Sequence, residues 1–205
     1  MNGLYAILDE SNFNFSNLKD CVQHMINFKI NIFQIRIKSK FSSFHIETIK
    51  SLKSLCRKNN CLLLLNDNVK LADELDLDGV HIGLNDLNFC DARKILGNNK
   101  IIGVSCYNNI SDAITAEQYG ASYVSFGSIF KTSTKVNPTK LNISTFTDAK
   151  NILNIPICLI GGINTNNVQD VINLNCDLIA ISKGLSSKND VELISKMYYE
   201  KNKII

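Results

Sequence analysis

Eight short apolar segments recur along the chain at intervals of about 20 to 30 residues, and each has the length of a buried strand. They are LYAIL (4–8), INIFQIRI (30–37), CLLLL (61–65), GVHI (79–82), IIGVS (101–105), SYVSF (122–126), IPICLI (155–160) and DLIAIS (177–182). The stretches between them show helical periodicity; in NLKDCVQHMINF, for example, Leu18, Val22 and Met25 share one face. The sequence therefore predicts repeated strand–helix units.

Continuous rather than alternating apolar strands are typical of a parallel sheet whose outer face is covered by helices. Eight such strands favour closure into a single α/β domain, a (β/α)8 TIM barrel over residues 1–205, although an open doubly wound sheet stays open as an alternative. With 205 residues and 45% hydrophobic content, the chain can bury one sizeable core and fits one domain better than two.

The charge of the chain limits the class of binding partner, and its cysteines indicate the cellular compartment. The chain carries 22 basic and 19 acidic side chains that are interspersed, which excludes a broad cationic face for nucleic acid or lipid, so we expect only small-molecule ligands. Its seven cysteines form no CxxC pair and mostly lie in apolar runs, as reduced core thiols do. No apolar run approaches the ~20 residues that span a bilayer, and a cytoplasmic location is expected.

Polar residues follow the predicted strands, where the loops of such a barrel form the active face. These residues are Gln34, Arg36, Lys38, Asn66, Asp67, His81, Gly83, Asp86, Ser105, Gly127, Gly161, Gly162 and Ser182.

Two cations and an amide alternate in QIRIK. On a strand, Gln34, Arg36 and Lys38 would share one face, while Ile35 and Ile37 would face the other way. Because two buried cations repel unless an anion lies between them, the pattern predicts a bound anion. The alternative is an edge strand with a solvated basic face.

Asp67 and Asp86 lie one strand–helix unit apart, so both can reach the same rim. Two carboxylates and phosphate oxygens form the hard oxygen cage that Mg2+ prefers, and Asn66 could hydrogen-bond a phosphate oxygen beside it. Alternatively, Asn66-Asp67 and Asp86 cap the helices that follow them.

Gly161-Gly162 and Ser182 fall where these barrels commonly bind a phosphate through backbone N–H groups. Thr132, Thr134 and Lys135, in a loop that precedes the seventh predicted strand, offer hydroxyls and a charge that could close over an anion. An ordinary Gly-Gly turn and a solvated basic loop remain the alternatives.

Together these segments resemble the thiamine phosphate synthase family from about Leu4 to Leu185. QIRIK is similar to the family's Gln-x-Arg-x-Lys strand, and LLNDNVKLADELDLDGVHIGLNDL is similar to its Asn-Asp and Gly-Val-His-x-Gly-x-x-Asp segment. KIIGVS, FKTSTK, IGGIN and AIS follow in the family's order. The resemblance implies an enzyme that transfers a hydroxymethylpyrimidine group from its diphosphate to a thiazole phosphate and releases pyrophosphate.

The resemblance also implies a role for each matched residue. The two acids, Asp67 and Asp86, would hold Mg2+, the implied cofactor. The pyrimidine diphosphate would be held by Gln34, Arg36, Lys38, Asn66, Ser105 and Lys135, of which Arg36, Lys38, Ser105 and Lys135 would act on the reacting diphosphate. The thiazole phosphate would be held by Thr132, Thr134, Gly161, Gly162, Ile181 and Ser182. Leu84, Tyr107 and the loop 136–140 depart from the family pattern.

Three other functions remain open from the sequence. A thiazole tautomerase would share the barrel but would need no diphosphate site, and Tyr107 stands where that relative tends to carry His. A sugar-phosphate isomerase or epimerase would need an acid–base pair that the strand ends do not offer. A non-catalytic barrel that binds phosphate ligands belongs to a different class. The sequence leaves the oligomeric state open, a homo-oligomer included.

Overall fold

The chain folds into a closed barrel of parallel strands. The computed structural model describes residues 1–83, 89–131 and 141–201. In that part of the chain, eight strands pair in sequence order and the last pairs with the first. The strands are β1 (Gly3–Asp9), β2 (Ile32–Arg36), β3 (Leu62–Asn66), β4 (Gly79–Gly83), β5 (Ile101–Tyr107), β6 (Tyr123–Phe126), β7 (Ile157–Ile160) and β8 (Leu178–Ile181).

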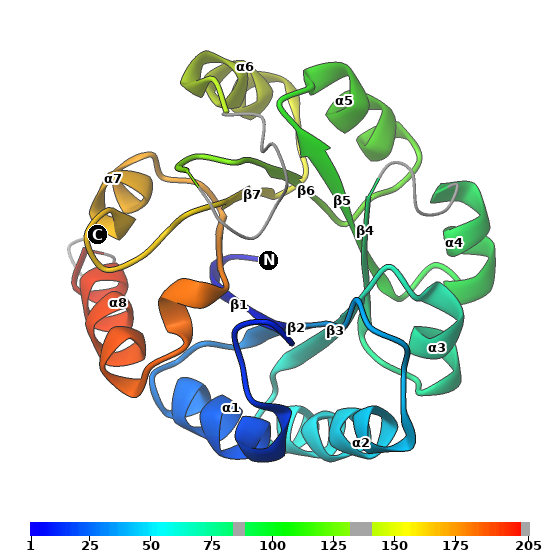
Figure 1. The fold of residues 1–205 in the computed structure, drawn as a ribbon. Helices are drawn as coiled ribbons and strands as arrows, with labels where there is room; N and C mark the ends of the chain where they lie inside the picture. The colour runs from blue at the N-terminus through cyan, green and yellow to red at the C-terminus, as the bar shows by residue number, and fades with distance from the viewer. Residues whose placement is uncertain (84–88, 132–140, 202–205) are drawn as a thin grey trace.

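Helices form a ring outside the strands, as Figure 1 shows. They are α1 (Leu18–Asn27), α2 (Ser43–Lys58), α3 (Val69–Glu74), α4 (Phe89–Leu96), α5 (Ile110–Gln118), α6 (Ile143–Ile152), α7 (Val168–Asn173) and α8 (Lys188–Lys201). Two 3-10 turns, η1 (Phe15–Asn17) and η2 (Lys183–Leu185), follow β1 and β8. The last helix, α8, packs against α1, so the ring of helices closes where the barrel does.

Strand pleating explains why the strands are apolar throughout. Alternate side chains point to opposite faces, and both faces are buried here. On β2, Phe33 and Ile35 pack in the core between barrel and helices, whereas Ile32 packs in a second core inside the barrel. On β1, Tyr5 belongs to the inner core in the same way.

The eight predicted strands and the barrel are thus confirmed, and the open sheet is excluded by the β1–β8 pairing. Strand ends differ by at most two residues from the apolar runs. The difference matters at β2, because it ends at Arg36 and leaves Lys38 in the following loop. The predicted face is confirmed for Gln34 and Arg36, whose neighbour Ile35 points outward into the helix layer.

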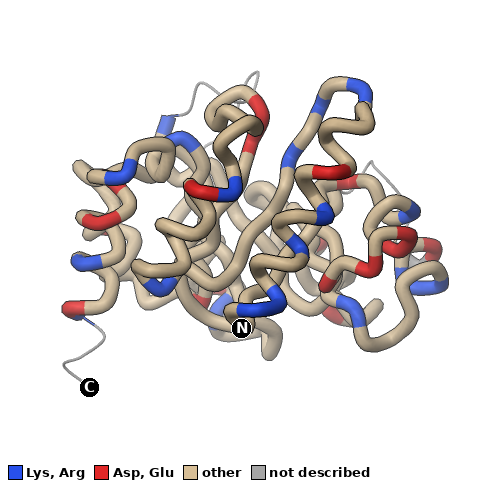
Figure 2. Tube along the Cα trace, turned by 90° about the horizontal axis from the view of Figure 1, so that it is seen from below, with Lys and Arg blue, Asp and Glu red and all other residues tan. Residues whose placement is uncertain are grey.

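Charged residues of both signs are spread over the trace, in keeping with the composition (Figure 2). Over residues 1–83, 89–131 and 141–201, no helix has the length and apolar character needed to cross a membrane. The six cysteines in these ranges whose side chains are described are free thiols, and Cys56, Cys106 and Cys158 are fully buried. Burial raises the pKa of Cys56 and of Cys106 to about 12, which keeps both as inert thiols.

Candidate active site at the barrel mouth

Arg36 ends β2 at the barrel mouth, paired with an acid from β1. Its guanidinium contacts a carboxylate oxygen of Asp9, the residue aligned with it in the β1–β2 register. Asp9 is only 3% exposed, and its second oxygen accepts hydrogen bonds from the backbone N–H and the hydroxyl of Ser11 at 2.9 and 2.5 Å. Burial alone would raise the pKa of Asp9, but the Ser11 and Arg36 contacts outweigh it and hold the pKa below its usual value. Arg36 is therefore fixed by a carboxylate that stays ionised.

Lys38 reaches across to the end of β3. Its ammonium nitrogen lies 2.5 Å from a carboxylate oxygen of Asp67. The two cations thus have counter-ions in the chain itself, Asp9 for Arg36 and Asp67 for Lys38, and the bound anion stays a prediction.

Asp67 adopts a left-handed backbone conformation with φ of 62°, directly after β3. Asp and Asn tolerate this region better than other residues that carry a side chain. The helix that follows is capped by Asn68, whose side-chain oxygen accepts from the backbone N–H of Leu71 at 3.1 Å. The capping interpretation of Asn66-Asp67 is therefore wrong, and the Asp67 carboxylate is directed to Lys38 instead.

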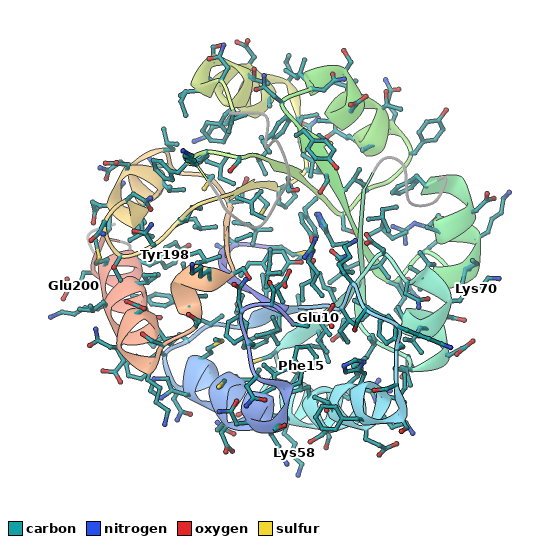
Figure 3. The ribbon with its side chains drawn as sticks, viewed as in Figure 1. Glu10, Phe15, Lys58, Lys70, Tyr198 and Glu200 are labelled. Carbon is teal, nitrogen blue, oxygen red and sulfur yellow. The ribbon has the colours of Figure 1, made fainter. Side chains whose placement is uncertain are left out.

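Glu10, the residue after Asp9, holds the backbone of the loop that contains Lys38. Its carboxylate accepts from the backbone N–H groups of Lys38 and Ser39 at 2.5 and 2.7 Å, and from the Ser39 hydroxyl at 2.6 Å. Figure 3 shows Glu10 toward the centre of the barrel, whereas Lys58 and Lys70 extend outward at its periphery. These hydrogen bonds fix the start of the loop that carries Lys38.

Inside the barrel, just below the mouth, polar side chains from five strands form a hydrogen-bonded row. Gln34 donates through Nε2 to the hydroxyl of Tyr5 at 2.5 Å, and the Tyr5 and Tyr123 hydroxyls lie 2.9 Å apart. The hydroxyl of Tyr123 lies 2.8 Å from Nδ1 of His81, whose Nε2 lies 2.9 Å from Oγ of Ser105. His81 is buried, as expected of a packed histidine.

A cavity of about 500 Å3 opens on the opposite side of the mouth, at the ends of β6, β7 and β8. Four predicted phosphate-site residues line it: Gly161, Gly162, Ile181 and Ser182. Two cations, Lys131 and Lys183, line it as well. The cavity has the volume of a small-ligand site, with glycine and positive charge together on its wall.

Glycine is required at both positions after β7. Gly161 has φ of 111°, and a Cβ there would lie 2.1 Å from Oγ of Ser128. Gly162 has φ of 69°, and a Cβ there would lie 2.6 Å from the carbonyl oxygen of Lys131. Glycine is therefore needed at both positions for packing against the neighbouring loop, and the approach of a phosphate to this backbone stays a prediction.

The mouth thus has two sides. The first carries Gln34, Arg36, Lys38, Asn66, Asp67 and Ser105 at the ends of β2, β3 and β5. The second is the glycine-lined cavity beside β7 and β8, and Asn12 in the loop after β1 donates to Oγ of Ser182 at 3.1 Å. The remaining predicted site residues, Asp86, Thr132, Thr134 and Lys135, lie outside the described residues, as do Leu84 and the 136–140 loop.

The donor set was tested for a metal ion. Among the described residues, no three His, Cys, Asp or Glu side chains gather at one point. Mg2+ takes only one or two protein carboxylates and completes its shell with water and phosphate oxygens, so the partly exposed rim position of Asp67 fits such a site.

Several residues of the mouth were not predicted from the sequence. Asp9 ends β1 and Glu10 follows it, and both carry the same signal, a polar residue after an apolar run, that identified the other strand ends. Lys131 and Lys183 follow strand ends too. Tyr5 and Tyr123 gave no signal, because a tyrosine in an apolar run reads as an ordinary core residue.

Comparison with known proteins places this architecture in a family. The family model described as Thiamine monophosphate synthase matches residues 4–185. The chain is 37% identical over 198 residues to a thiamine-phosphate synthase of Nitrosomonas eutropha, covering 97% of this chain and 93% of the relative. It is 36% identical over 196 residues to a thiamine-phosphate synthase of Nitrosococcus oceani, covering 96% of this chain and 90% of the relative.

A solved structure agrees with these sequence relatives. The thiamine phosphate pyrophosphorylase of Pyrococcus furiosus superposes with a TM-score of 0.85 at 28% identity, over 96% of this chain and 95% of that one. The family model, which matches residues 4–185, extends over the strands that carry both sides of the mouth, from β1 to β8. The chain therefore belongs to the thiamine monophosphate synthase family.

Proposed function

We propose that the protein is a thiamine phosphate synthase, which joins a hydroxymethylpyrimidine group, supplied as its diphosphate, to a thiazole phosphate and releases pyrophosphate. The observation that carries the proposal is the two-sided mouth. Cations and an acid lie on the β2–β3 side, and a cavity of the size of a small ligand lies on the β7–β8 side.

The β2–β3 side suits the diphosphate. As the carbon–oxygen bond to the pyrimidine methylene breaks, negative charge accumulates on the leaving diphosphate. Asp9 holds the Arg36 guanidinium in place before the substrate arrives, whereas Glu10 holds only the backbone at Lys38, whose exposed side chain pairs with Asp67. A fixed charge such as that of Arg36 stabilises the transition state without having to reorganise during the reaction.

Asp67 and Asp86 would hold Mg2+ beside the same diphosphate. When bound, the ion would supply positive charge to the leaving group. Asn66, 9% exposed at the end of β3, would hydrogen-bond a phosphate oxygen next to it.

The β7–β8 cavity suits the second substrate. Gly161 and Gly162 let the phosphate of the thiazole approach the backbone, and Lys131 and Lys183 supply positive charge at the same wall. Thr132, Thr134 and Lys135, from the neighbouring loop, complete the proposed set. With both substrates held, the thiazole nitrogen attacks the pyrimidine methylene, so no nucleophile from the protein is needed.

The setting of the reaction is also part of the proposal. The six described cysteines are free thiols rather than disulfides, which supports a cytoplasmic location, where thiols stay reduced. The partners are the two small substrates.

Direct synthesis tests the proposal. The purified protein is mixed with both substrates, with and without Mg2+, and pyrophosphate release and thiamine phosphate formation are followed together. Lys38→Met should lower turnover strongly, whereas Lys58→Met, at an exposed lysine on the outer end of α2, should not. Tight binding of the thiazole phosphate without pyrophosphate release would support a non-catalytic barrel. Conversion of a thiazole phosphate without the diphosphate substrate would support a tautomerase.

A further inference from the structure

The hydrogen-bonded row inside the barrel connects two residues that the proposed function assigns to the pyrimidine substrate. It runs from Gln34 on β2 through Tyr5 on β1, Tyr123 on β6 and His81 on β4 to Ser105 on β5. Each link is 2.5 to 2.9 Å long. The three central side chains are at most 8% exposed, so water does not compete for these bonds.

Both tyrosines remain protonated, which limits what each can do. Burial raises the pKa of Tyr5 and of Tyr123 well above that of a free tyrosine. Each hydroxyl therefore has one hydrogen to donate, and each also accepts. A buried hydroxyl between two partners should give its hydrogen to one and accept from the other, because accepting from both would leave its own hydrogen unpaired.

This rule sets one direction for the whole row. Because Nε2 of Gln34 donates to Tyr5, the Tyr5 hydrogen goes to Tyr123. Tyr123 must then give its own hydrogen to Nδ1 of His81. This nitrogen can accept it only if it carries no hydrogen itself.

The hydrogen positions at the Ser105 end of the row follow from the same rule. The hydrogen of His81 sits on Nε2 and is donated to Oγ of Ser105. The Ser105 hydrogen is thereby directed away from His81, and Ser125, with Oγ at 3.5 Å, is too distant to hold it firmly.

We propose that Tyr5 and Tyr123 are positioning residues that couple the amide orientation of Gln34 to the hydroxyl orientation of Ser105. With Nε2 turned into the row, Gln34 offers its oxygen as an acceptor while Ser105 offers a hydrogen as a donor. If the amide were reversed, every link would have to reverse, and the two ends would exchange roles. The ends therefore always present one donor and one acceptor.

Such a pair of ends selects a class of substrate. It fits a heteroaromatic ring that carries an N–H donor and a ring-nitrogen acceptor, and it opposes a ring with two donors or two acceptors. The inference rests on the proposed function only in placing the pyrimidine between Gln34 and Ser105.

Packing alone does not account for the row. Tyr5 and Tyr123 meet edge to face with ring centroids 6.0 Å apart, and His81 stacks on Tyr123 at 5.5 Å. Phenylalanine would preserve these ring contacts without burying a hydroxyl, which is costly unless the hydroxyl is paired. Tyr123→Phe therefore separates the two roles, because it keeps the ring and cuts the row at its centre.

The test begins with the hydrogen position on His81. The full chain, labelled with 15N at histidine, is studied by NMR, and the His81 signals are assigned by their loss in His81→Gln. We expect the wild-type ring to carry its hydrogen on Nε2, with Nδ1 accepting a hydrogen bond. In Tyr123→Phe the hydrogen should redistribute between the two nitrogens. Tyr119→Phe, at an exposed tyrosine, should leave the His81 signals unchanged.

Kinetics provides the second measurement. Tyr123→Phe should raise KM for the pyrimidine diphosphate about tenfold, the loss expected for one misdirected hydrogen bond, with KM for the thiazole phosphate unchanged. Tyr5→Phe cuts the row one link earlier and gives the same two measurements if Tyr123→Phe does not fold. A wild-type hydrogen on Nδ1, or a Tyr123→Phe variant with wild-type His81 signals and wild-type KM, would overturn the proposal. The NMR result needs no substrate, so it stands apart from the outcome of the synthesis assay.

Discussion

The ammonium nitrogen of Lys38 and a carboxylate oxygen of Asp67 lie 2.5 Å apart, which joins the loop after β2 to the end of β3. The side chains are 53% and 26% exposed, and ion pairs at such positions contribute at most ~1 kcal/mol to stability. A substrate can therefore replace this pair at little cost. In the proposed complex, Lys38 would turn to the diphosphate and Asp67 to the metal ion.

Asp67→Asn should abolish most of the Mg2+-dependent turnover while changing the free energy of unfolding by less than ~1 kcal/mol. Asparagine tolerates the left-handed backbone of this position but lacks the charge that binds a metal. Turnover is measured over a Mg2+ titration, and stability by urea unfolding. Asp73→Asn, at an exposed acid on α3, is the control and should behave as wild type. An Asp67→Asn enzyme with normal Mg2+ dependence would contradict the metal-binding role.

Asp9→Asn should lower both turnover and stability, the latter by ~2 kcal/mol, because it leaves the Arg36 guanidinium without its buried partner. The folded pKa of Asp9 lies below its unfolded value of about 3.9. Its stabilising contribution is therefore complete above that pH and is lost as the pH falls through the folded pKa. Unfolding by urea across the acid range should show a shallower pH dependence for the variant than for wild type. Equal slopes would show that the charge of Asp9 does not contribute to the stability of the protein.

Gly162→Ala and Gly97→Ala form a matched pair, because the two glycines have φ of 69° and 68°. Alanine at Gly97 meets nothing within 4 Å, so this variant should lose only the ~1 kcal/mol of left-handed strain. Alanine at Gly162 would also meet the Lys131 carbonyl oxygen at 2.6 Å, so the phosphate cavity should deform. We expect a raised KM for the thiazole phosphate in Gly162→Ala alone. Similar KM values in both variants would argue against phosphate binding at this wall.

The buried thiols should be inert in the folded protein. Burial raises the pKa of Cys56 and of Cys106 to about 12, so neither forms thiolate near neutral pH. Alkylation at about pH 8, mapped by mass spectrometry, should modify the half-buried Cys21 before either of them. Rapid modification of Cys106 would show that β5 opens far more readily than its packing indicates.

Much of the fold could be predicted from sequence because each strand is buried on both faces and therefore appears as a continuous apolar run. Closure was predicted only from the number of strands, since the apolar runs themselves do not reveal that β1 and β8 are neighbours. Lys38 was assigned to a strand face because the alternation in QIRIK continues past Arg36, where the sheet pairing stops. The local pattern thus identified Lys38 as a site residue but did not show that it lies in a loop.

The site residues also divide into those that could be predicted from sequence and those that could not. The cations and acids of the mouth stand out in sequence, because charge is unusual at the end of a buried run. The row from Gln34 to Ser105 does not, because its links join residues 24 to 118 positions apart and depend on the register of five strands. Asp9 was predictable, and its partnership with Arg36 follows from their alignment in β1 and β2.

The β1–β8 seam also has a consequence for synthesis of the chain on the ribosome. β1 is the first strand to emerge, and one of its edges finds its partner only when residues 178–181 have been made. Until then a growing chain holds an open sheet edge and lacks the wall that Ser182 completes. The barrel mouth therefore cannot close on the ribosome until residues 178–181 have been released to pair with β1.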